Sequence, residues 1–100
     1  MEAVIDIIAR KMERQSETEE VVYFVRCGEN VKIGYSNGRL KKRLAQLQTG
    51  NPTKLSLEWF VRGNRMTEWQ IHFEQQHKRV NGEWYKLTNE EVWDIVKKYI

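Results

Sequence analysis

Residues 22–50 read VYFVRCGENVKIGYSNGRLKKRLAQLQTG, and this stretch predicts two strands followed by a helix. Val21–Val25 and Val31–Tyr35 are rich in β-branched and aromatic residues, and the five residues between them are turn-prone. A helix is predicted from about Arg39 to Thr49, because Gly50 can take the left-handed conformation that ends a helix and Pro52 cannot continue one. The stretch is therefore expected to form a β-hairpin that leads into a helix.

The predicted helix is amphipathic and basic. Leu40, Leu44 and Leu47 recur at helical spacing and define its buried face. Arg43 lies about 60° from Leu40 at roughly 100° per residue, so its side chain is expected at the edge of that face. The other basic residues of the helix are expected to point outward.

Two further elements follow before residue 80. Leu55 to Val61 alternates apolar and polar residues, which predicts a third strand with one buried face. A second helix is predicted over about Arg65 to Lys78, with a core stripe of Met66, Trp69 and Phe73 and with Glu68 and His72 beside that stripe.

The remaining segments predict the order αββαβαβα. Residues 2–14 are amphipathic and predict an N-terminal helix, and residues 82–87 predict a short strand. Thr88-Asn-Glu-Glu91 has the pattern of a capping box, which predicts a final helix. We divide the chain into a helix and acidic linker (1–20), a core (21–87) and a C-terminal helix (88–100), all expected to form one compact domain.

Composition limits the class of protein. The chain is 40% hydrophobic and 31% charged, as expected of a folded soluble domain. No apolar run approaches the roughly 20 residues of a membrane span, and no signal peptide precedes the first predicted helix, so no membrane partner is expected. A single cysteine, Cys27, excludes an internal disulfide and a cysteine-rich zinc site, and a cytoplasmic location is expected.

Positive charge is concentrated in the hairpin and helix. Residues 21–65 carry nine basic side chains against two acidic ones, whereas the flanking segments are net acidic. Such clustering suits a surface that contacts phosphates, although basic helices are also common as plain solvated faces.

Several motifs resemble the GIY-YIG endonuclease family. Val21-Val-Tyr23 stands where that family has its first tripeptide, Lys32-Ile-Gly34 where it has the second, and Arg43 where it has an arginine. The resemblance extends to Glu68-Trp-Gln-Ile-His72-Phe73 and to Gly82-Glu-Trp-Tyr85, as in the small phage-type single-domain subgroup. It implies an α+β fold with a three-stranded antiparallel sheet flanked by helices, here with additional N- and C-terminal helices.

The resemblance also implies a metal-dependent endonuclease that hydrolyses DNA phosphodiester bonds with one Mg²⁺ or Mn²⁺ ion. Glu68 would bind the ion, Arg43 would donate hydrogen bonds to the phosphate, and His72 would be a proton donor or an indirect ligand. Because Val21 and Lys32 depart from the family pattern, it stays open whether Tyr23, Lys32 or Tyr35 is the general base. Phosphate contacts are expected from Arg39, Lys41, Lys42 and Lys54.

Other interpretations remain open at this stage. The same fold could bind DNA with weak or lost catalysis, or could bind a protein, and the chain could be a monomer or a homodimer. The four tryptophans, Trp59, Trp69, Trp84 and Trp93, are expected in the core rather than as base-stacking platforms.

Overall fold

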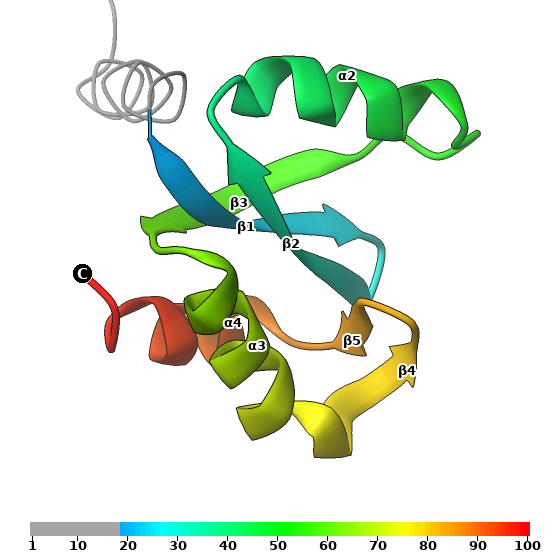
Figure 1. Cartoon of the computed structure of the whole chain (residues 1–100). Coiled ribbons are helices and arrows are strands. Elements are labelled where there is room, and N and C mark those ends of the chain that lie inside the picture. Colours follow the sequence, from blue (N-terminus) through cyan, green and yellow to red (C-terminus); the bar gives the residue numbers. More distant parts are fainter. Residues whose placement is uncertain (1–18) are drawn as a thin grey trace, which may run out of the picture.

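The computed structural model describes residues 19–100 (Figure 1). The helix that the sequence predicts over residues 2–14 lies outside this range. The described elements are, in chain order, β1 (Glu20–Cys27), β2 (Asn30–Asn37), α2 (Leu40–Thr49), β3 (Ser56–Arg62), α3 (Arg65–Glu74), the 3-10 turn η1 (Gln76–Lys78), β4 (Arg79–Asn81), β5 (Trp84–Lys86) and α4 (Asn89–Val96).

The predicted hairpin and the helix that follows it are confirmed. β1 and β2 pair in antiparallel register from Glu20–Asn37 to Cys27–Asn30. Gly28, the first residue of the two-residue turn between them, has a φ of 61°, a conformation that glycine adopts without steric cost. Leu40 of α2 is buried, and Leu44 and Leu47 pack partly against the same cluster, so this helix contacts the sheet through the leucine stripe.

The sheet has five antiparallel strands in the order β3-β1-β2-β5-β4, so the expected three-stranded sheet is wrong. The two additional strands form a short hairpin along β2, with Val31 opposite Tyr85. This hairpin satisfies an edge of β2 that would otherwise present unpaired backbone groups. Residues 79–81 are too few for their pattern to predict a strand, and they pair with β5.

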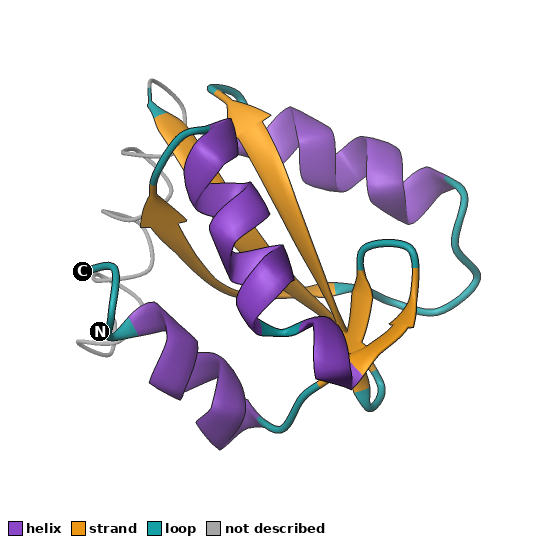
Figure 2. Cartoon of the chain, turned by 60° about the horizontal axis from the view of Figure 1, so that its bottom comes forward, coloured by secondary structure: helices purple, strands orange, loops and turns teal. Residues whose placement is uncertain are grey.

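The helices cover opposite faces of the sheet. One apolar cluster joins Tyr23 and Val25 of β1 to Leu40 of α2. The other joins Phe24 of β1 to Ile71 of α3 and to three buried residues of α4. Figure 2 views the sheet from the side on which α3 crosses it. The chain therefore has two thin cores, and consecutive residues of β1 belong to different ones.

The apolar stripe predicted for the core side of α3 lies on its outer side. Met66, Trp69 and Phe73 are 69%, 61% and 58% exposed, whereas Glu68 and Ile71 are buried. At roughly 100° per residue, Ile71 lies about 200° from Trp69. Periodicity identified a helix correctly but not which side faces the sheet, because the buried side carries a glutamate. Helix α3 also ends at Glu74 rather than at Lys78.

The expectation that all four tryptophans lie in the core is also wrong. Trp69 and Trp93 are exposed, and Trp59 and Trp84 are half-buried. Trp93 keeps an edge-to-face contact with Trp59, with ring centroids 5.5 Å apart. Strand β3 departs from simple alternation too, because the pairing of β1 with β3 shifts register between Phe24 and Val25. This bulge puts Leu57 against the α2 cluster and Trp59 against the other cluster, so β3 has no single buried face.

Candidate metal centre and basic pocket

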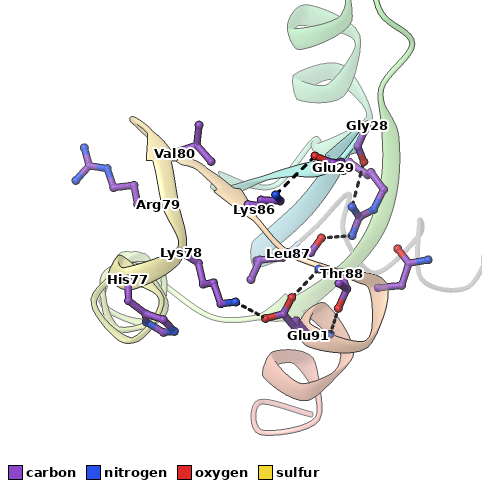
Figure 3. A pocket seen from close by; sticks show the side chains of 12 residues that line it. Gly28, Glu29, His77, Lys78, Arg79, Val80, Lys86, Leu87, Thr88 and Glu91 are labelled. Carbon is purple, nitrogen blue, oxygen red and sulfur yellow. Dashed lines mark hydrogen bonds and ion pairs between the residues drawn. The ribbon is translucent and has the colours of Figure 1, made fainter.

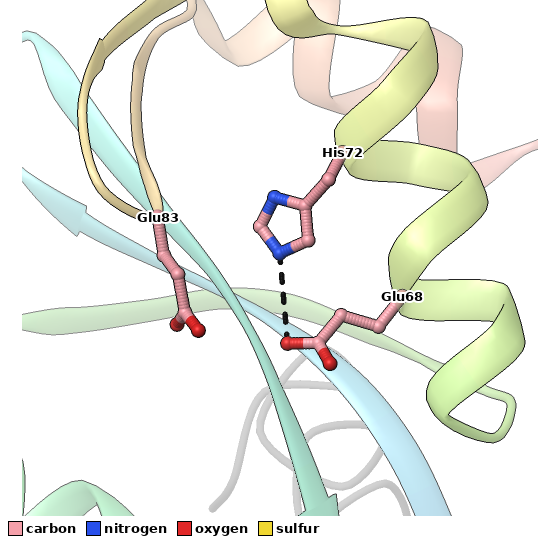
Figure 4. A group of neighbouring side chains, drawn as sticks. All are labelled: Glu68, His72 and Glu83. Carbon is pink, nitrogen blue, oxygen red and sulfur yellow. Dashed lines mark ion pairs between the residues drawn. The ribbon is translucent and has the colours of Figure 1, made fainter.

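Three side chains with metal-ligating atoms converge beside α3 (Figure 4). Glu68 and His72 project from adjacent turns of α3, and Glu83 projects from the turn between β4 and β5. One ligand atom of each lies within 4.8 Å of those of the other two. Two carboxylates and an imidazole nitrogen are a donor set that fits a divalent cation.

Local structure fixes each of these residues. Asn64 caps α3 by accepting hydrogen bonds from the backbone N–H groups of Met66 and Thr67, at 2.9 and 3.1 Å. Glu68 follows in the first turn, where the helix dipole favours a carboxylate. Gly82, with a φ of 54°, allows the tight turn that presents Glu83, and the Glu83 carbonyl accepts a hydrogen bond from the Ile33 N–H at 3.0 Å. The cluster is thus built on two elements anchored to β2.

The His72 ring is held between two partners. Its Nδ1 lies 2.5 Å from the Tyr85 hydroxyl, and its Nε2 lies 3.5 Å from Glu68 Oε2. Burial raises the pKa of the Tyr85 phenol, and Glu83 and Glu68 raise it further, against an opposing effect of Arg79. Tyr85 therefore remains a neutral hydrogen-bonding partner at neutral pH. The second ring nitrogen of His72, Nε2, is directed to Glu68.

A basic pocket of about 320 Å³ adjoins the cluster. It opens between the end of β2 and the start of α2, and its lining carries four cationic side chains and no carboxylate: Arg39, Lys42, Arg43 and Arg65. Arg65 joins the pocket to the cluster, because its guanidinium lies 4.5 Å from the centre of the Tyr35 ring and its Nη1 lies 4.0 Å from Glu68 Oε1. A phosphate in this pocket would meet four cationic side chains, of which only Arg65 has a carboxylate within 4.0 Å among residues 19–100.

The predicted site residues fall into three groups. Glu68, His72 and Lys32 lie at the cluster, where Lys32 Nζ is 3.1 Å from Glu83 Oε2. Tyr35, Arg39, Lys42 and Arg43 line the pocket. Lys41 and Lys54 are exposed but outside that lining, and Tyr23 lies elsewhere.

Two of the three candidate bases have environments that bear on that role. Burial, with Glu20 beside it, raises the pKa of the Tyr35 phenol, although Arg65 opposes the shift. A phenol with a raised pKa stays protonated and acts as a hydrogen-bond donor at neutral pH. Tyr23 is fully buried on the α2 face of the sheet, opposite the face that carries α3. The ring of Tyr23 covers Gly34, where an added Cβ would come within 2.3 Å of the phenol.

We expect Tyr23→Phe to raise the free energy of unfolding by about 1 kcal/mol. The Tyr23 hydroxyl is buried and has no hydrogen-bond partner within residues 19–100, so removing it relieves a desolvation cost. Urea denaturation measures the change. Tyr85→Phe is the matched control, because its hydroxyl is paired with His72, and it should lower stability instead. A destabilised Tyr23→Phe variant would contradict the prediction.

The sequence did not assign three residues of this region. Glu83 and Tyr85 lie in the Gly82–Tyr85 motif, but the sequence assigns them no definite role, because their approach to α3 depends on the β4–β5 hairpin. From the sequence, Arg65 is one of the nine basic residues of 21–65 and has no specific role. Its position before a capped helix and three residues ahead of Glu68 was the available signal, since i and i+3 side chains are neighbours on a helix.

A second pocket, of about 870 Å³, lies away from the cluster between the β1–β2 turn, η1, β5 and the start of α4 (Figure 3). Three of its basic side chains are each ion-paired with a glutamate, at 3.1, 3.9 and 2.7 Å: Lys78 with Glu91, Lys86 with Glu29, and Arg26 with Glu58. Each of these three cations already has a carboxylate partner, whereas Arg39, Lys42 and Arg43 of the basic pocket have none within residues 19–100. The basic pocket beside Glu68 is therefore the better phosphate site.

Comparison with protein families assigns the chain to one family. Residues 9–100 match the T5orf172 domain, which covers most of the sequence. The chain belongs to the T5orf172 domain family. This family is associated with endonuclease-like and DNA-binding domains, so membership is compatible with a nucleic-acid-related function. Nothing among curated proteins or among solved structures matches the chain.

This result corrects the resemblance drawn from the motifs. The matching family is the T5orf172 domain and not the GIY-YIG family, for which there is no match, so the assignment to that family and to its phage-type subgroup is wrong. Short tripeptides and single residues are weak signals, and two of those positions already departed from the pattern. No helix within residues 19–100 of this T5orf172 domain has the length and hydropathy that crossing a membrane requires.

Proposed function

We propose that this T5orf172 domain is an endonuclease that hydrolyses DNA phosphodiester bonds and requires one divalent ion, Mg²⁺ or Mn²⁺. The observation that carries the proposal is the continuity of the carboxylate cluster with the basic pocket. Arg65 lies between them, 4.0 Å from Glu68 and over the ring of Tyr35. A phosphodiester bound by the arginines would then have its phosphorus next to the carboxylates.

Each side chain has a role that its position supports. Glu68 binds the divalent ion, which would lower the pKa of water and offset charge on the phosphate. Arg43 and Arg65 donate hydrogen bonds to phosphate oxygens, with Arg39 and Lys42 as further cations at the pocket. Tyr35, whose phenol is protonated at neutral pH, donates a hydrogen bond to the same group.

Metal dependence of cleavage tests the proposal. Supercoiled plasmid and branched DNA are incubated with the purified chain in Mg²⁺, in Mn²⁺ and in EDTA. Nicking with either ion and none with EDTA is expected. DNA that is retarded on a gel but cut under no condition would overturn the nuclease and support the alternative, a binding module in which the basic pocket holds phosphate without chemistry.

A matched pair on α2 tests the pocket. Arg43→Ala is expected to reduce cleavage by about a hundredfold, because removing one preorganised donor to a charged transition state has effects of this size. Lys41→Ala removes an equal charge from the same helix outside the pocket lining, and should change the rate by less than about threefold. Equal effects of the two substitutions would show that α2 contributes only general positive charge.

A further inference from the structure

We propose that the ion is held by three protein ligands, Glu68, His72 Nε2 and Glu83, and that Lys32 Nζ competes with it for Glu83. This inference rests on the proposed function for the need of an ion, and it names the donors and the class of metal. A site with an imidazole ligand favours Mn²⁺ over Mg²⁺, which prefers oxygen donors and keeps its waters.

The spacing of the donors is close to that of a bound state. Two ligands that are each about 2.1 Å from one ion lie about 3.0 Å apart in adjacent octahedral positions and about 4.2 Å apart in opposite ones. The three donor atoms already lie within 4.8 Å of one another. A pair of donors at the upper limit must close by roughly 1 to 2 Å to become adjacent ligands. The Glu83 side chain, which is exposed at the hairpin turn, has the freedom to move.

The largely buried carboxylate of Glu68 would be stabilised by a bound cation. Only 9% of the residue is exposed, and within residues 19–100 no hydrogen bond reaches its carboxylate. The nitrogen atoms nearest to its oxygens are His72 Nε2 at 3.5 Å and Nη1 of the exposed Arg65 at 4.0 Å. A carboxylate that is largely buried, with 12% of its side chain exposed, gains from a divalent ion at the position that His72 and Glu83 also face.

Tyr85 selects the orientation of His72 that ligation requires. A histidine that binds an ion through Nε2 must carry its proton on Nδ1 and give it to an acceptor. The Tyr85 oxygen lies 2.5 Å from Nδ1 and is positioned to accept that proton in a hydrogen bond. Tyr85 is only 2% exposed, so the ring has a fixed, buried partner on one side and the carboxylates on the other. Tyr85 is therefore a positioning residue.

Lys32 supplies the charge that the ion would replace. Its ammonium lies 3.1 Å from Glu83 Oε2 and is mostly buried, with 15% of the side chain exposed. A cation so close to a ligand opposes the approach of a second, divalent cation. Removing this charge should therefore strengthen ion binding, which is the opposite of what loss of a metal ligand does.

Direct metal binding to the full chain, without DNA, tests the inference. Mn²⁺ is titrated and the free ion is followed by electron paramagnetic resonance, with Mg²⁺ as competitor and circular dichroism as the check of folding. The unchanged chain should bind Mn²⁺ at least about tenfold more tightly than Mg²⁺. Glu68→Gln, His72→Ala and Glu83→Gln should each weaken Mn²⁺ binding by about tenfold or more, and Tyr85→Phe by about tenfold.

Two further variants distinguish binding at this site from a general effect of charge on Mn²⁺ affinity. Lys32→Met should tighten Mn²⁺ binding by about fivefold. Glu90→Gln removes an exposed carboxylate of α4 outside the cluster and should leave the affinity unchanged. His72→Ala should also reduce the preference for Mn²⁺ over Mg²⁺, which a general loss of structure would not do.

The outcomes separate this inference from the proposed function. Weakened binding in the Glu68 variant alone, with the His72 and Glu83 variants unchanged, would overturn the three-ligand site. Weaker binding in Lys32→Met would overturn the competition. Tight Mn²⁺ binding by the three ligands in a chain that cleaves no DNA would support the site and contradict the nuclease.

Discussion

Glu68→Gln is expected to lower DNA cleavage by at least about a thousandfold while DNA affinity changes by less than about threefold. The carboxylate is the buried member of the cluster, and its loss removes the ligand that holds the ion next to the phosphate. A loss of about 4 kcal/mol of transition-state stabilisation corresponds to this factor. Affinity depends instead on the cations of the basic pocket, which the substitution leaves in place.

Cleavage rates under saturating Mn²⁺ and gel retardation in EDTA measure the two effects separately. Glu90→Gln is the control, because it removes one exposed negative charge away from the cluster. Loss of cleavage and of DNA binding in equal proportion would contradict the role given to Glu68. It would indicate either a variant with a damaged fold or a site where this side chain contacts DNA itself.

Ile71→Ala is expected to lower the free energy of unfolding by about 3 kcal/mol, and Trp69→Ala by less than about 1 kcal/mol. Ile71 is 1% exposed and packs in the cluster that joins the sheet to α3 and α4, so its truncation leaves a cavity. Trp69 is 61% exposed, and its stacked partner is Phe73, 5.5 Å away on the same helix and also exposed. Removing the larger side chain should therefore have the smaller effect.

Urea denaturation followed by circular dichroism measures both variants, since it does not depend on tryptophan emission. The comparison is informative because hydrophobicity scales alone predict a larger loss of stability for Trp69→Ala than for Ile71→Ala. A Trp69→Ala variant as unstable as Ile71→Ala would contradict the exposed position of the Met66–Trp69–Phe73 stripe and show that other residues cover it in the folded chain.

Local patterns predicted the elements near Glu68 better than their mutual arrangement. The i and i+4 spacing of Glu68 and His72 was enough to place them together, because neighbouring turns of one helix bring such pairs within a few ångströms. Tyr23 and Lys32 lie on adjacent strands, and the hairpin was also predicted. Their surroundings nevertheless differ, since Tyr23 is enclosed beneath α2 whereas the Lys32 ammonium reaches Glu83 at the β4–β5 turn.

The sequence by itself determined the β1–β2 hairpin, the leucine stripe of α2, the capped start of α4 and the clustering of basic residues before Glu68. All of these depend on residues close together in the chain. Only the tertiary structure decided that β4 and β5 extend the sheet, that Glu83 and Arg65 flank Glu68, and that α3 turns its aromatic stripe outward. The orientation of α3 is settled by contacts of Ile71 and His72 with β1, β2 and β5, which are distant in sequence. Periodicity reports that a helix has two faces, but only packing selects the one that is buried.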